Sequence, residues 1–405
     1  MPVVCTRVGL ALGVACLTLL SAPASAAEPN CTNTARFSDW MADFRREAMA
    51  AGISPRTISR ALDGIALDEK VISRDRKQGF FAQSFGTFSK RLATDHRVQA
   101  SRKKIEANAT HFSRALAQYG VPAEVITGLW ALESDFGRGM GNFPVLPALA
   151  TLAYDCRRGE LFRGELLAAL KIIERGDLDP EEMVGSWAGE LGQTQFLPKH
   201  YLEHAVDYDG NGRINLFSSD ADVIGSTAAF LKHLGWRASE PWLEEVVLTR
   251  DLDWQEADLT IKHPRQTWAG WGVKAADGGP LQSDSLPASL LLPMGRLGPA
   301  FLAYQNFDIY LQWNQSLNYA TTAAWLATRI GGAGPMQGRE RDIPFLSLDD
   351  AKALQQILTR RGYDVGKIDG VIGAKTRSAI KAMQIKYGLP ADSYPTPELL
   401  EKLRG

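Results

Sequence analysis

One carboxylate, Glu133, lies in the apolar stretch Gly128–Gly137, GLWALESDFG. On a helix it would share a face with Leu129 and Trp130, which precede it by four and three residues. Burial in apolar surroundings raises the pKa of a carboxyl group. The chemistry indicated is therefore general-acid catalysis, in which a protonated acid gives its proton to a leaving glycosidic oxygen. The alternative is a glutamate that caps or pairs at a helix end.

A second dense stretch, SWAGELGQTQFLP, covers residues 186–198. Its two glycines allow a chain or ligand to approach closely. Its glutamines can donate and accept the hydrogen bonds that sugar hydroxyls and N-acetyl groups require, and its Trp and Phe offer faces for sugar rings. A tight packing turn is the alternative, but this density favours a saccharide cleft. The substrate-binding residues predicted here are Ser186, Trp187, Gln193 and Gln195.

A third stretch has the residue types of a cation site. Asp207, Asp209 and Asn211 alternate and are followed by Gly212, which is the front half of an EF-hand-like calcium loop. The twelfth position is Ser218 instead of Glu, so the ordinary loop is incomplete. The alternative is a turn rich in Asp and Asn that binds no metal.

Length and composition bound the architecture. The chain has 405 residues, which is too long for one hydrophobic core, so we expect two or three domains. It is 45% hydrophobic and 22% charged with a formal net charge of -1. A nucleic-acid-binding protein would usually carry a basic domain or stripe, so no nucleic-acid partner is expected.

The N-terminus has the pattern of an export signal. Arg7 precedes the apolar run Val8–Leu20, and Ala24–Ala26 supplies small residues for cleavage after residue 26. A membrane anchor is the alternative, but the run is short for a span. Neither Cys5 nor Cys16 ends a lipoprotein box, so we expect a soluble periplasmic protein with no stable membrane insertion once residues 1–26 are removed.

Two cysteines then remain, Cys31 and Cys156. In an oxidising compartment such a pair predicts a disulfide, although two separate buried thiols are the alternative.

Hydrophobic periodicity predicts a mainly helical protein. Helices are expected from 37, from 55, across 86–118, from 122 to 133, and at about 145–156, 160–175, 222–235 and 319–330. A β-rich insertion is expected at about 241–312, with strands at 245–248, 259–262 and 289–293. The composition of GGAGP predicts a linker at 331–344, before a small unit at 345–405 with helices at 348–361 and 376–387.

These motifs together resemble the membrane-bound lytic transglycosylase B family. The resemblance covers about 35–330 and rests on Glu133-Ser, Gly139-x-Gly141, ALATLAYD at 148–155, Arg157-Arg158 and Gly189-x-x-Gly192-x-x-Gln195-Phe-x-Pro198. It implies a lysozyme-like fold for 32–330, with peptidoglycan glycan strands as substrate. By resemblance Glu133 is the sole acid and base. It protonates the oxygen between N-acetylmuramic acid and N-acetylglucosamine, then takes the proton of the muramic C6 hydroxyl as a 1,6-anhydro ring closes.

A tethered nucleophile removes the need for a second protein carboxylate. Asp135 is poorly placed as a partner for Glu133, and no other second cleft carboxylate is identified from the sequence. The resemblance also implies that Asn314 and Tyr319 line the cleft opposite the acid. Trp313 stands where a Tyr is often found, and for it a cleft contact and simple packing stay open.

The resemblance closes the metal loop with Asp222 and adds the backbone carbonyl of Arg213. The predicted ligands of a structural Ca²⁺ are therefore Asp207, Asp209, Asn211, Arg213 and Asp222, and no organic cofactor is expected.

Residues 345–405 resemble the common peptidoglycan-binding domain, a three-helix module. Met383 stands where Phe is usual, which is a tolerable core exchange. Asp369 and Thr376 are interpreted as turn and cap residues. Such a module would hold an enzyme at the wall by raising its local concentration.

The sequence therefore predicts a lytic murein transglycosylase. The alternatives are a hydrolytic muramidase, which a second cleft carboxylate would indicate, and a non-catalytic murein-binding scaffold. Other wall enzymes as partners are neither indicated nor excluded.

Overall fold

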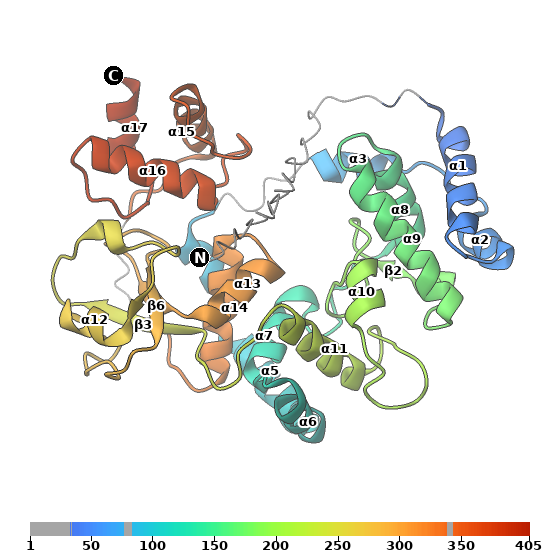
Figure 1. Cartoon of the computed structure of the whole chain (residues 1–405), viewed down its shortest axis with the longest axis horizontal. Helices are drawn as coiled ribbons and strands as arrows, with labels where there is room; N and C mark the ends of the chain where they lie inside the picture. Colours follow the sequence, from blue (N-terminus) through green and yellow to red (C-terminus); the bar gives the residue numbers. More distant parts are fainter. Residues whose placement is uncertain (1–32, 34, 77–82, 338–342) are drawn as a thin grey trace, which may run out of the picture.

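The computed structural model describes residues 33, 35–76, 83–337 and 343–405, so the predicted export signal and Cys31 lie outside the described residues. The described part is mainly helical, as predicted (Figure 1). Its helices are α1 Phe37–Ala50, α2 Pro55–Leu62, α3 Glu69–Arg76, α4 Phe85–Leu92, α5 Asp95–Ala107, α6 Ala109–Tyr119, α7 Ala123–Ser134, α8 Val145–Tyr154, α9 Gly159–Arg175, α10 Pro198–His204, α11 Asp220–His233, α12 Arg265–Gly270, α13 Gln305–Trp313, α14 Leu317–Ile330, α15 Leu348–Arg360, α16 Ala374–Lys386 and α17 Pro397–Arg404. Within these ranges no helix is both long and apolar enough to cross a membrane.

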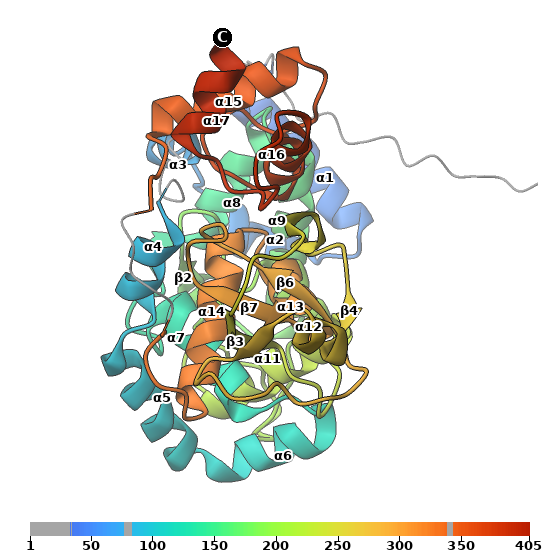
Figure 2. The same ribbon diagram turned by 90° about the vertical axis from the view of Figure 1, so that its left-hand side faces the viewer.

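Helix α7 packs against α5, α6, α11 and α14, and Figure 2 shows it beside α14. It is buried nearly along its whole length, including Leu129 and Trp130. Gly128 packs against α14, where a Cβ on it would lie 3.5 Å from Ala327, an ordinary van der Waals contact. The helix ends one residue after Glu133, because Asp135 and Phe136 take left-handed backbone conformations with φ of 49° and 59°. Glu133 therefore lies near the end of the apolar helix α7, just before the turn at Asp135 and Phe136.

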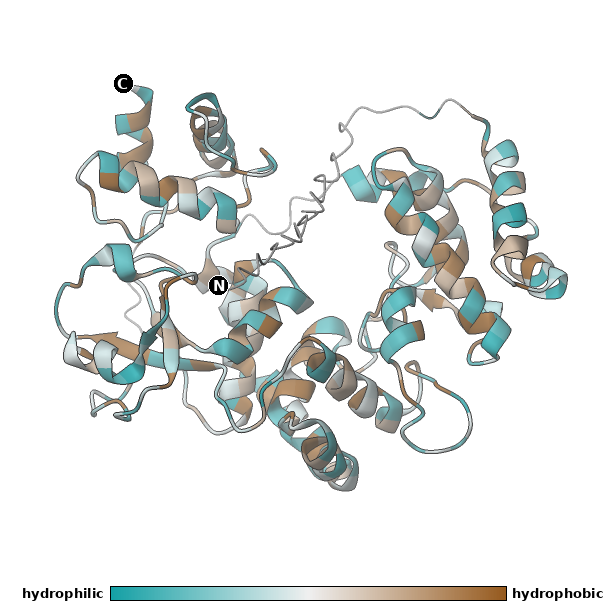
Figure 3. Ribbon diagram, viewed as in Figure 1, coloured by the Kyte–Doolittle hydropathy of each residue, from teal (hydrophilic) through white to brown (hydrophobic). Residues whose placement is uncertain are grey.

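Helices α8 and α9 pack against each other as an apolar pair, and Figure 3 shows brown, hydrophobic residues along both. Val145–Ala153 of α8 is almost entirely buried because the stretch VLPALATLA is apolar on every face. A short antiparallel ribbon joins β1 (Phe143–Pro144) to β2 (Val184–Gly185). This ribbon fixes the start of the 186–198 segment beside the loop that follows Glu133.

A five-stranded antiparallel sheet forms the predicted β-rich part. Its strand order is β4-β6-β7-β3-β5, with bounds β3 Leu243–Leu248, β4 His263–Pro264, β5 Val273–Ala275, β6 Pro287–Leu291 and β7 Ala300–Ala303. Val246 pairs with Ala300 on one side and Ala275 on the other. The sheet has its own core around the buried Trp268, whose indole N–H donates to the Ala288 carbonyl at 2.8 Å.

The strand predictions were only partly right. The one at 245–248 lies in β3 and the one at 289–293 overlaps β6, but 259–262 is not a strand. Strand β7 was missed because all four of its residues are buried, which removes the alternation that reveals a strand. Helix α13 begins at Gln305, inside the range expected to be β-rich.

The three C-terminal helices, α15, α16 and α17, surround a separate small core. Met383 is 1% exposed within it, which agrees with its predicted core role. Asp369 accepts the Val371 N–H in a turn, as predicted. Thr376 is not a cap; it is buried inside α16, and its hydroxyl donates to the Val365 carbonyl at 3.0 Å.

This C-terminal unit packs against the sheet region (Figure 1). Arg377 donates to the Leu292 carbonyl at 2.9 Å, and Asp392 accepts the backbone N–H of Arg296 at 3.0 Å. Lys381 forms an ion pair with Asp258 at 3.0 Å. These contacts hold the unit at a defined place on the larger region.

Candidate active site

Glu133 is held by two donors from helices far along the chain. The Trp313 indole N–H, at the end of α13, donates to Glu133 Oε1 at 2.7 Å. The Tyr319 hydroxyl, in the first turn of α14, donates to the same oxygen. Trp313 is therefore a cleft contact of the acid, which decides between the two interpretations left open by the sequence.

The surroundings of Glu133 make it a good proton carrier at neutral pH. Burial raises its pKa from 4.5 to about 7, against the opposing effect of the hydrogen bonds from Tyr319 and Trp313. Both donors use Oε1, and no described residue donates to Oε2. A proton on the neutral acid therefore sits on Oε2, the oxygen left for a ligand.

Gln193 joins the 186–198 segment to the end of α7. Its side-chain carbonyl accepts the Trp130 indole N–H at 3.0 Å, and its amide donates to the Phe217 carbonyl at 3.1 Å. Its backbone carbonyl accepts the Ser134 hydroxyl at 2.6 Å. Gly137 is required beside it, because a Cβ would come within 2.8 Å of Gln193 Oε1 at a φ of +87°. Gln193 is 5% exposed and holds the segment in place.

The other predicted substrate residues include Gln195, Trp187 and Asn314. Gln195 has a φ of 51°, and its amide donates to the Gly192 carbonyl at 2.8 Å, which leaves its side-chain oxygen available. Trp187 is half-buried. Asn314 follows Trp313 directly, and its side-chain oxygen accepts the Ser316 N–H at 2.9 Å as α14 begins.

Phe196 was expected as a sugar platform, but it is buried. Its ring contacts those of Trp313 and Phe230, with centroids 5.7 and 5.3 Å away. It therefore supports the Trp313 indole that donates to Glu133.

Sequence reasoning missed a second carboxylate, Glu190. The Ser186 hydroxyl donates to Glu190 Oε2 at 2.8 Å. The charge of Glu190 contributes to the raised pKa of Glu133, so the two carboxylates act on each other. The sequence offered no second carboxylate as a partner for Glu133, and the structure adds Glu190 as a charge that acts on it. Glu190 lies inside the stretch that was singled out, but its spacing from Glu133 follows only from the fold.

Comparison with known proteins gives the family. Residues 36–328 match the transglycosylase SLT domain, and residues 347–403 match the putative peptidoglycan binding domain. The first match spans more than half of the chain. The chain belongs to the transglycosylase SLT domain family. This confirms the predicted mainly helical, lysozyme-like region followed by a peptidoglycan-binding unit.

Individual relatives agree with this placement. The membrane-bound lytic murein transglycosylase B of Escherichia coli K12 is 44% identical over 214 residues, which are 53% of this chain and 58% of the relative. The chain thus spans less than two thirds of that relative. SltB3 of Pseudomonas aeruginosa, in complex with NAG-anhNAM-pentapeptide, is 42% identical with a TM-score of 0.84 over 91% of this chain and 99% of its own. Escherichia coli Slt35, in complex with calcium, is 28% identical with a TM-score of 0.61 over 72% of this chain and 92% of its own.

In this SLT domain the predicted metal loop brings its acids together. Carboxylate oxygens of Asp207, Asp209 and Asp222 lie within 4.8 Å of one another. Asp222 comes from α11 and is fully buried, and burial raises its pKa. In the described part of the chain no Lys or Arg forms an ion pair with these three acids. Three converging carboxylates without a counter-charge fit a hard divalent cation.

The two remaining predicted ligands are also in this loop. The Asn211 side-chain oxygen accepts the Arg213 N–H at 2.9 Å, so the loop is ordered by its own hydrogen bonds. The Arg213 side chain points to Glu182, so its predicted contribution rests on the backbone carbonyl alone.

Cys156 is disulfide-bonded. Its predicted partner Cys31 lies outside the described residues, so the pairing stays a prediction.

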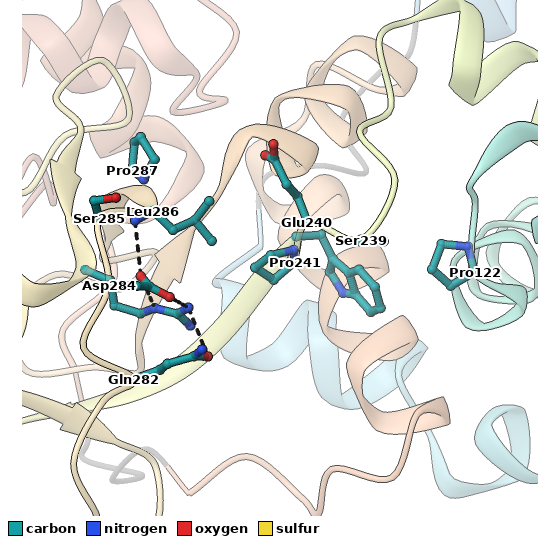
Figure 4. Close-up of a pocket in the computed structure, with 11 residues that line it drawn as sticks. Pro122, Ser239, Glu240, Pro241, Gln282, Asp284, Ser285, Leu286 and Pro287 are labelled. Carbon is teal, nitrogen blue, oxygen red and sulfur yellow. Dashed lines mark hydrogen bonds and ion pairs between the residues drawn. The ribbon is translucent and has the colours of Figure 1, made fainter.

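A separate cavity of about 770 Å³ lies beside the sheet (Figure 4). Its charged wall is neutralised internally, since Arg265 pairs with Asp284 and hydrogen-bonds to Gln282 at 3.1 Å. None of its lining residues belongs to the site around Glu133.

Proposed function

We propose that this chain is a lytic murein transglycosylase that cleaves the β-1,4 bond between N-acetylmuramic acid and N-acetylglucosamine in peptidoglycan. The observation that carries the proposal is Glu133, a carboxyl with a pKa of about 7 whose Oε1 is fixed by two donors and whose Oε2 is free. The name of the Escherichia coli relative and the NAG-anhNAM-pentapeptide bound to SltB3 support the same substrate class.

In the first step, Glu133 Oε2 gives its proton to the glycosidic oxygen as the bond between that oxygen and muramic C1 breaks. Trp313 and Tyr319 stabilise the carboxylate that forms, because both donate to it. Positive charge builds on the sugar ring as the leaving group departs.

In the second step, the muramic C6 oxygen bonds to C1 and its proton returns to Glu133. No water is consumed, and the enzyme ends in its starting state. A pKa near 7 suits both steps, since an acid that must also act as base works best with a pKa near the operating pH.

A hydrolytic muramidase is the second candidate, because Glu190 supplies the second carboxylate that hydrolysis would use. A non-catalytic scaffold is disfavoured by the intact acid and its two donors.

We further infer that residues 1–26 are an export signal, that 32–330 form the catalytic region with the sheet as its insertion, and that 345–405 bind the wall after a linker at 331–344. The compartment would be the periplasm. Calcium at Asp207, Asp209 and Asp222 would hold the loop between α10 and α11, and a homologue solved with calcium supports this.

The test is digestion of purified sacculi followed by mass spectrometry. Products that end in 1,6-anhydromuramic acid support the transglycosylase, whereas reducing ends alone would show hydrolysis. Glu133→Gln should abolish release while sedimentation with sacculi persists. The matched control is Asp135→Asn, a carboxylate two residues away that faces Arg97 and Arg138, and it should stay active.

A further inference from the structure

We propose that Glu190 is a second functional carboxylate of this cleft, which acts electrostatically through Glu133 in both proton transfers. The inference rests on the proposed function and deepens it. It concerns a residue between the two glycines of the 186–198 segment.

The backbone at Glu190 is fixed on several sides. Gly185 packs directly on the Glu190 carbonyl, since a Cβ on Gly185 would lie 2.1 Å from that oxygen. Leu191 and Phe196 form an isolated bridge, with N–H to carbonyl distances of 2.7 and 3.1 Å. Glu190 therefore lies in a turn whose backbone is fixed by these contacts.

That turn contacts both structures that hold Glu133. At one side Gln193 accepts the Trp130 and Ser134 donors at the end of α7. At the other side Phe196 packs against Trp313, the indole that donates to Glu133. The position of Glu190 relative to Glu133 is thus set by packing on both sides.

The Glu190 side chain is oriented by Ser186. The Ser186 hydroxyl donates to Glu190 Oε2 at 2.8 Å and accepts the N–H groups of Ala188 and Glu190 at 3.1 and 3.3 Å. A hydroxyl has one proton and two lone pairs, so Ser186 is fully used. Ser186 therefore positions Glu190, and within the described residues no donor reaches Glu190 Oε1.

The charges around the pair have opposing effects. Burial raises the pKa of Glu190, while the Ser186 hydrogen bond and the positive charge of Arg158, at the start of α9, oppose this rise. Glu133 faces Tyr319 and Trp313 from α14 and α13, and Glu190 from the turn. Like charges in a poorly solvated site disfavour each other, so ionising one acid makes the other hold its proton more tightly.

This coupling serves the second half of the reaction. When Glu133 has protonated the leaving oxygen, it becomes an anion beside Glu190. The repulsion makes it a stronger base, which favours recapture of the C6 hydroxyl proton as the C1–O6 bond forms. The negative charge of Glu190 also stabilises the positive charge on the sugar ring in the transition state.

The test is the pH profile of kcat/KM for the wild type and Glu190→Gln. Glutamine keeps an acceptor for Ser186 and removes the charge of Glu190, so the pKa of Glu133 should fall. The basic limb of the profile should therefore move to lower pH. For each unit of movement the rate well above the limb falls about tenfold. Glu190→Asp, which restores the charge, should move the limb back, and Asp135→Asn should leave it unchanged.

An unmoved limb in Glu190→Gln overturns the proposal. If the limb is unmoved and the variant loses only reducing-end products, Glu190 is instead a base for water. If Glu190→Gln does not fold, Ser186→Ala retains both acids and removes the donor that favours charged Glu190. Its basic limb should also move to lower pH, and no movement counts against the proposal. Product ends from the wild type test the transglycosylase assignment separately, since they do not depend on any shift.

Discussion

Replacing Glu133 with glutamine should stabilise the protein at alkaline pH while it abolishes cleavage. The folded pKa of Glu133 is about 7, against 4.5 for an unperturbed glutamate. Below pH 4.5 the side chain is neutral in both states and costs nothing. Between pH 4.5 and 7 only the unfolded chain ionises, so stability falls, and above pH 7 the loss is complete.

The size of the effect follows from the shift in pKa. Each unit corresponds to about 1.4 kcal/mol, which for this shift gives roughly 3 kcal/mol above pH 7. Solvent reaches part of the carboxylate, so roughly 2 kcal/mol is a fair lower figure. Glutamine is uncharged at every pH and its oxygen can accept from Trp313 and Tyr319, so Glu133→Gln escapes this penalty.

The assay is thermal unfolding of both proteins at pH 4 and pH 8.5. The difference in free energy of unfolding should be near zero at pH 4 and reach about 2 to 3 kcal/mol at pH 8.5, a shift in Tm on the order of 5 °C. Asp135→Asn serves as the control for loss of a nearby carboxylate, and should show no comparable gain at pH 8.5. An equal difference at both pH values would refute the reasoning, because it would mean that Glu133 is not strained by ionisation in the fold.

Three further predictions concern other parts of the site and the fold. Trp313→Phe removes a donor that favours the charged form of Glu133, so the basic limb of kcat/KM should move to higher pH, opposite to Glu190→Gln. The kcat at pH 7 should fall roughly tenfold. A limb that moves to lower pH would contradict the role of the indole. Calcium at a hundredfold excess over its Kd should raise the free energy of unfolding by about 2.7 kcal/mol, which scanning fluorimetry with calcium and with a chelator would measure. Asp222→Asn should abolish the effect. An equal Tm with calcium and with the chelator would exclude a structural ion. Arg377→Ala should break the contact with the Leu292 carbonyl. Amide hydrogen exchange should then become faster at the end of strand β6 and in α16, while exchange in α7 is unchanged. Unaltered exchange would show that this contact does not hold the C-terminal unit.

Much of the local structure was predictable from the sequence. Glu133 was placed on the buried face of a helix because Leu129 and Trp130 precede it at helical spacing. The first part of the predicted metal loop was visible because Asp207, Asp209 and Asn211 alternate, whereas the distant Asp222 was expected only from the family resemblance. The Gly-rich turn and helix pattern of 345–405 identified the C-terminal unit. In each case neighbouring residues carry the signal.

The sheet shows where periodicity stops being informative. Strand β7 is buried on both faces, and the 259–262 segment has strand-like composition but lies in turns. Which of the two forms a strand depends on pairing with β3 and β6, which are contacts between distant residues.

The catalytic environment was decided by tertiary structure. The sequence determined that one buried acid exists at the end of α7. Only the fold placed the Trp313 and Tyr319 donors on its Oε1, across 180 and 186 residues, and only the fold brought Glu190 to its side. The physical reason is that a hydrophobic pattern specifies which face of an element is buried but not which element covers it. The pKa of Glu133 depends on those covering groups, so its chemistry is a property of the packed protein.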